Sequence, residues 1–143
     1  MQALGREFES PRVQRREKMY LLIFLLLVSH LAFDWLLQPP EMASKKRDLR
    51  SLAGYVHSFF NVVGIIIAVG SWALIMNVSL PMGTFALLLL FNFVTHLLID
   101  AGKMNLVYKK EWKCNESKEF WWVTGIDQFL HLIILAAIAA ILY

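Results

Sequence analysis

The chain is 143 residues long, 58% hydrophobic and carries a formal net charge of +3. Its length suits one domain, and four apolar segments of roughly 20 residues are each long enough to span a bilayer, which excludes an ordinary soluble domain. One cysteine excludes an intrachain disulfide framework. The basic residues lack the aromatic interleaving of nucleic-acid-binding modules, so we expect no nucleic-acid partner.

The first 18 residues are polar, mixed in charge and without apolar periodicity, which predicts disorder. The run Arg15-Arg16-Glu17-Lys18 directly precedes Met19. A purine-rich ribosome-binding sequence translated in frame would encode such residues before a start codon. We therefore interpret residues 1–18 as a disordered tail or a non-native extension, and residues 19–143 as the membrane domain.

Four apolar helices are predicted, and together they indicate an all-α fold, a four-helix transmembrane bundle. The first is expected to end before Pro39-Pro40, because proline cannot continue a helix. Glycines 64 and 70 are expected to let neighbouring helices approach closely. The expected spans are residues 20–38, 54–76, 83–101 and 119–143.

The connecting loops differ in charge. A tight turn at residues 77–82 contains no basic residue, whereas residues 41–53 and 102–118 together carry nine Lys and Arg. Basic loops accumulate on the cytoplasmic side, so we expect a multi-pass protein of the inner (cytoplasmic) membrane with both charged loops in the cytoplasm. The five basic residues of the N-terminal tail argue the other way.

The charged loops also suggest contacts with the membrane surface. Their lysines are expected to touch anionic lipid headgroups, and Leu49 and Leu52 could anchor a short surface helix. The bilayer is therefore the expected partner, and the sequence specifies no protein partner.

Polar residues recur at helical spacing inside the apolar segments. Residues four apart share one face of a helix, so His30, Asp34 and Gln38 form a polar stripe in the first span. Every other span repeats this pairing of a histidine with an acid or amide. The repeats are His57 with Asn61, His96 with Asn92 and Asp100, and Asp127 with His131.

In an antiparallel bundle, all of these residues fall in the half of the membrane nearer the charged loops. A carboxylate at the bilayer centre costs roughly 2.5–3.5 kcal/mol on insertion scales, so the acids require compensation. Histidine and carboxylate are suitable ligands for a divalent metal, Zn or Mn foremost. The predicted ligands are His30, Asp34, His57, His96, Asp100, Asp127 and His131. The amides expected to orient them are Gln38, Asn61, Asn92 and Gln128.

These residues favour a metal-dependent hydrolase acting on a membrane-accessible substrate, with Asp34, Asp100 or Asp127 as general base. One alternative is a metal-ion or proton conduit, since His and Asp relays serve such pathways. Another is a small regulatory protein that binds a larger partner and uses the polar network only to fix its bundle. Lys103 could extend to the interface or bind an anionic substrate.

The combined pattern resembles a family of small uncharacterised integral membrane proteins of bacteria and their phages. The family pattern is H-x-x-x-D-[FW]-x-x-Q in the first helix, a histidine in the second, H-x-x-x-D with a following lysine in the third, and D-Q-x-x-H in the last. The resemblance covers residues 19–143 and implies a membrane bundle but no reaction. The matching positions are His30, Asp34, Trp35 and Gln38; His57; His96, Asp100 and Lys103; and Asp127, Gln128 and His131.

Overall fold

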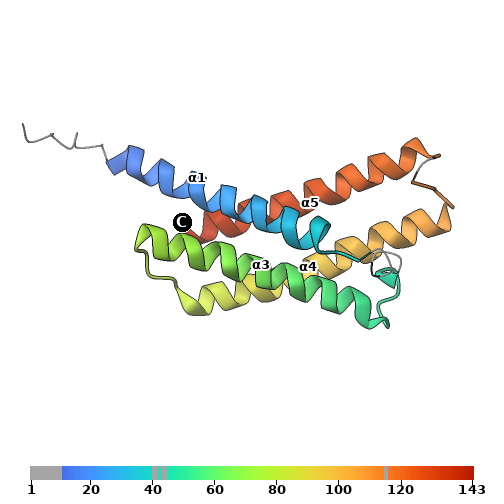
Figure 1. Ribbon diagram of the computed structural model, residues 1–143, viewed down its shortest axis with the longest axis horizontal. Helices are drawn as coiled ribbons and strands as arrows, with labels where there is room; N and C mark the ends of the chain where they lie inside the picture. The colour runs from blue at the N-terminus through green and yellow to red at the C-terminus, as the bar shows by residue number, and fades with distance from the viewer. Residues whose placement is uncertain (1–10, 40–41, 43–44, 115) are drawn as a thin grey trace, which may run out of the picture.

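Four long helical segments run alternately up and down in the computed structural model, which describes residues 11–39, 42, 45–114 and 116–143 (Figure 1). Each is long and apolar enough to cross a membrane, which confirms the predicted four-helix membrane bundle. The elements are α1 (Pro11–His30), its continuation as a π-helix η1 (Leu31–Leu36), α3 (Leu52–Met76), α4 (Met82–Lys109) and α5 (Lys118–Leu142).

Helix α1 begins earlier than the sequence predicted. Residues 11–18, expected to be disordered, form its first turns, while residues 1–10 of the expected tail lie outside the described residues. Proline is favoured in the first helical turn, and two aromatic donors hold the extension in place. The indole of Trp72 donates to the carbonyl oxygen of Lys18 at 2.8 Å. The hydroxyl of Tyr143 donates to the backbone carbonyl oxygen of Arg15.

Helix α4 ends later than predicted, at Lys109 rather than near residue 101. The first charged loop packs against this extension: the Arg47 guanidinium lies 3.6 Å from the centre of the Tyr108 ring, and Asn105 donates to the Arg47 carbonyl. The surface helix expected around Leu49 lies partly outside the described residues, and residues 46–51 form turns and a bend.

The helices contact one another as a closed ring in which α1 packs on α3, α3 on α4, α4 on α5 and α5 on α1. One of the two glycines expected to permit close approach does so. A Cβ atom on Gly64 would lie 2.5 Å from Ser29 Oγ and 2.7 Å from the Phe33 ring. Gly70 has open space instead, so that expectation was wrong: its position faces away from the neighbouring helices.

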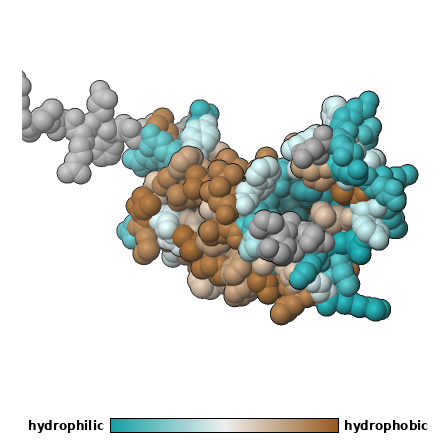
Figure 2. Space-filling model, turned by 45° about the vertical axis from the view of Figure 1, so that its right-hand side comes forward, coloured by the Kyte–Doolittle hydropathy of each residue, from teal (hydrophilic) through white to brown (hydrophobic). Residues whose placement is uncertain are grey.

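The interior is divided by depth. At the end near the 77–82 turn, the core is apolar and includes the buried Trp72. At the end with the charged loops, the interior contains histidines, acids and amides. The surface shows a matching division, with a hydrophobic middle and hydrophilic residues gathered at the charged-loop end (Figure 2). The apolar core residues are Leu22, Leu26, Ile65, Ala68, Val69, Trp72, Phe85, Leu88, Leu135, Ile138, Ala139 and Leu142.

Candidate metal centre

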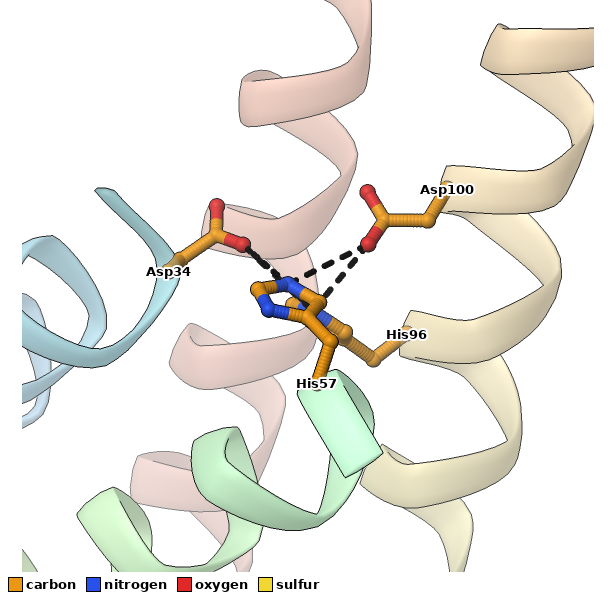
Figure 3. Close-up of side chains that lie close together, drawn as sticks. All are labelled: Asp34, His57, His96 and Asp100. Carbon is orange, nitrogen blue, oxygen red and sulfur yellow. Dashed lines mark hydrogen bonds and ion pairs between the residues drawn. The ribbon is translucent and has the colours of Figure 1, made fainter. Parts of the chain in front are cut away.

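Two histidines and two aspartates from three segments meet in the bundle (Figure 3). Asp34 comes from η1, His57 from α3, and His96 and Asp100 from α4. All four are at most 5% exposed, and one ligand atom from each lies within 4.8 Å of the other three. The predicted convergence of polar residues from separate membrane helices is therefore present, and this group could hold a metal ion.

The separations of these atoms resemble a tetrahedral ligand shell. Zn–N and Zn–O bonds of about 2.0–2.2 Å place neighbouring ligand atoms roughly 3.3–3.6 Å apart. His57 Nε2 lies 3.3 Å from Asp100 Oδ2, and His96 Nε2 lies 3.5 Å from both carboxylates. Two separations are shorter: His57 Nε2 donates to Asp34 Oδ1 at 2.7 Å and lies 3.0 Å from His96 Nε2. A bound ion would need only a small expansion of the group.

The other ring nitrogens of His57 and His96 lack the hydrogen bonds that usually orient a coordinating histidine. His57 Nδ1 and His96 Nδ1 are buried without a hydrogen-bond partner among the described residues. Coordinating histidines usually donate this proton to a carbonyl or carboxylate, which fixes the ring. Here both rings are oriented by packing, since their centres lie 5.0 Å apart and both residues are 1% exposed.

The π-helix η1 brings Asp34 to this centre. In a regular α-helix, each step of four residues drifts about 40° around the axis, so a stripe from Leu22 through Leu26 and His30 would rotate away from the core. A π-helix has more residues per turn, which reduces the drift. Leu37 N accordingly donates to Ala32 O, five residues back, and Asp34 stays buried at 4% exposure.

Lys46 was not predicted to be part of the site. We expected the loop lysines to contact lipid headgroups, but Lys46 is only 6% exposed and its Nζ lies 2.7 Å from Asp100 Oδ2 and 3.8 Å from Asp34 Oδ1. It also donates to Gln38 Oε1 at 3.0 Å. The expectation was wrong for this residue because two buried carboxylates attract a cation inward. Its neighbour Lys45 is exposed, and the sequence does not distinguish the two.

A second group shares Asp100 with the first and adds Asp127 and His131 from α5. His131 Nδ1 donates to the backbone oxygen of Asp127 at 2.9 Å, which leaves the lone pair on Nε2. That Nε2 atom and Asp127 Oδ1 are both buried without a hydrogen-bond partner among the described residues. Lys103 donates to the other oxygen, Oδ2, at 2.9 Å. Asp100 therefore belongs to both groups.

His30 belongs to neither group, although the sequence suggested it as a ligand. Asn61 Oδ1 accepts from Asn92, so the Asn61 amide nitrogen donates to His30 Nδ1 at 3.3 Å. His30 Nε2 then donates to Gln128 Oε1 at 3.2 Å. Both ring nitrogens are therefore occupied by hydrogen bonds.

The four amides form the surroundings of the two groups. Gln128 Nε2 donates at 3.1 Å to Asp34 Oδ2 and also at 3.1 Å to Asp127 Oδ2, which links the two groups. Asn61 donates to His30 and accepts from Asn92, while Gln38 accepts from Lys46. Gln128, Asn61 and Gln38 thus bind the acids, His30 and Lys46, whereas Asn92 binds Asn61, and among the described residues none of the four donates to His57 Nδ1 or His96 Nδ1.

Residues 22–143 match the model of a family described as "Protein of unknown function (DUF3307)". The chain belongs to the DUF3307 family. This agrees with the resemblance to an uncharacterised family that the sequence motifs indicated. No curated protein and no solved structure matches the chain. The DUF3307 match includes every candidate site residue.

The candidate site opens into a cavity of about 570 Å³. Its walls include the acids of both groups, the two lysines and the aromatic side chains of η1 and α5. The exposed thiol of Cys114 also lines it. A molecule in this cavity would therefore contact carboxylates, ammonium groups and an apolar surface at once.

Proposed function

We propose that this membrane protein is a metal-dependent hydrolase whose reaction takes place at the charged-loop end of the bundle. The observation that carries the proposal is the convergence of Asp34, His57, His96 and Asp100 at separations close to a tetrahedral ligand shell. Neutral imidazoles with carboxylates suit Zn or Mn. A divalent ion there would supply Lewis-acid polarisation of a phosphoryl or acyl oxygen.

The residues around the ion would have separate roles. Asp34 and Asp100 would serve as ligands, which leaves Asp127 as the general base. Lys103 and Gln128 hold Asp127 Oδ2, while its Oδ1 atom has no partner among the described residues. A base needs one oxygen free to accept a proton from a nucleophilic water. Gln128 would keep the base and Asp34 in fixed relation, since it donates to both.

The membrane placement is part of the proposal. The charged loops would face the cytoplasm, because basic residues gather there by the positive-inside rule, and the membrane would be the inner (cytoplasmic) one. Lys46 and Cys114 from these loops line the cavity, so it lies at the same end of the bundle. Substrate and products would thus be exchanged at or near the cytoplasmic surface of the bilayer.

Metal content of protein purified in detergent tests the proposal. We expect stoichiometric Zn or Mn by inductively coupled plasma mass spectrometry, lost in His96→Gln and Asp100→Asn. His30→Gln is a matched control because His30 lies outside both ligand groups, and it should keep its metal. Equal metal content in all variants, or none in folded wild type, would refute the centre.

A second candidate is a small regulatory protein in which the same residues only fix the bundle. The Lys46 ammonium favours it, because this group already neutralises Asp100 and lies close to Asp34. Folded, metal-free wild type would support this candidate. A conduit is disfavoured, because the described core in the other half of the bundle is apolar.

A further inference from the structure

Two cavities adjoin at Trp121 on helix α5. One is the site cavity described above, and the other is an outer groove of about 500 Å³ along the same helix. Trp122, Ile126 and Phe129 line the groove, so its wall is almost entirely apolar. The site cavity combines charged and apolar walls and lies beside this apolar groove, with Trp121 as a wall residue of both, which suits a molecule with a charged head and a hydrocarbon chain.

The site cavity also reaches the side of the bundle that faces lipid. Trp35 on η1 and Trp121 on α5 both line it, and they are 55% and 56% exposed. Both segments are candidate membrane spans, and tryptophan is enriched where a membrane meets water. An amphiphile could therefore pass from the bilayer between η1 and α5 without leaving the lipid phase.

Charge indicates which headgroup the site cavity accepts. Three carboxylates and two ammonium groups line it, Asp34, Asp100 and Asp127 against Lys46 and Lys103, a formal balance of −1. A divalent ion changes the balance to +1, which favours an anion. Lys103 is the more accessible of the two lysines, with its side chain 18% exposed, and an ammonium group binds phosphate well.

We infer that the substrate of the proposed metal centre is a membrane lipid with a phosphate headgroup. The lipid enters sideways between η1 and α5, its phosphate lies beside Lys103 and the metal, and its chain lies in the groove along α5. This inference rests on the proposed function, because the metal supplies the charge that makes the site cavity attractive to an anion.

Gly125 provides a selective test of the groove. It lines the groove, and a Cβ atom added there would meet nothing within 4 Å, so Gly125→Leu should fill the groove without disturbing the bundle. Gly102 has the same open surroundings and lines neither cavity. Gly102→Leu is therefore the matched control. Lys103→Gln and Lys103→Arg test the contact with the headgroup.

Native mass spectrometry of the metal-loaded full chain would measure binding of phosphatidic acid and of phosphatidylcholine with the same acyl chains. We expect at least about tenfold tighter binding of phosphatidic acid, because its phosphate monoester accepts charged hydrogen bonds from Lys103 that the choline group of phosphatidylcholine hinders. Gly125→Leu should weaken it about tenfold while Gly102→Leu leaves it unchanged. Lys103→Gln should reduce the preference, and Lys103→Arg should keep it.

The same samples separate the possible failures. Metal-loaded protein that binds both lipids equally would overturn the lipid inference and leave the metal centre in place. Binding of glycerol phosphate as tight as that of phosphatidic acid would also overturn it, because the chain would then contribute nothing. Folded protein without metal would overturn the proposed function, and with it the charge balance that attracts the phosphate.

Discussion

Replacing Lys46 with methionine should have opposite effects on the metal-free and metal-bound protein. The Lys46 ammonium lies 2.7 Å from Asp100 Oδ2 and 3.8 Å from Asp34 Oδ1. It therefore neutralises the same carboxylates that a metal ion would bind. Methionine keeps most of the length and apolar volume of the side chain and removes the charge. Without metal, the variant should be less stable, because the buried carboxylates lose the cation that neutralises them. With metal, the variant should bind the ion more tightly, because the ion no longer competes with the ammonium for the carboxylates.

Both effects can be estimated. Removing one partner from a buried ion pair costs about 3–5 kcal/mol, which corresponds to a fall in melting temperature on the order of 10 °C for a chain of this size. Two unit charges 4 Å apart interact by about 4 kcal/mol at an effective dielectric constant of 20. Removing even a third of such a repulsion between the Lys46 ammonium and the metal ion would tighten metal binding about tenfold.

The assay is thermal unfolding in detergent after chelation, together with metal titration of the same sample. Lys45→Met is the control, because Lys45 is the exposed neighbour of Lys46 and its loss should change neither quantity. The reasoning fails if the Lys46→Met variant binds metal no better than wild type while its chelated form unfolds at a lower temperature. That result would mean that the ammonium only stabilises the bundle.

Three further variants test the fold and the position of the site. Gly64→Ala should lower the free energy of unfolding by about 1–3 kcal/mol, because its new methyl group would overlap Ser29 and the Phe33 ring. Gly70→Ala is the control and should leave the stability unchanged, because Gly70 has open space. Equal denaturation midpoints for the two variants would contradict this packing. Inserting one alanine between Ala32 and Phe33 adds the rotation of one residue, about 100° in an α-helix, before Asp34, which should turn this side chain away from the site and abolish metal loading; a fully loaded insertion variant would show that the helical register at η1 does not position the ligand. Asn92→Leu should cost about 0.6–1.7 kcal/mol, since it removes one hydrogen bond between membrane helices, and leave the metal content intact; loss of metal would place Asn92 nearer the ion than its contacts suggest.

The spans and the candidate ligands could be predicted from local properties of the sequence. Bilayer thickness sets the length of an apolar helix, and prolines and charged loops mark its ends. The cost of burying an acid in lipid makes each intramembrane His or Asp require partners. An antiparallel arrangement then places these residues at one depth, which was enough to predict that they meet.

Only the tertiary structure determined which of these residues meet. Lys45 and Lys46 are adjacent lysines that the sequence does not distinguish, yet only Lys46 is buried. The carboxylates that attract it, Asp34 and Asp100, come from η1 and α4. The π-helix η1 packs against α3, where Gly64 admits the Phe33 ring at close range. His30 matches the other histidines by spacing, yet two amides from α3 and α5 use both of its nitrogens. Helical spacing specifies a face of one helix, whereas contacts between helices depend on their rotation and separation, which the full bundle sets.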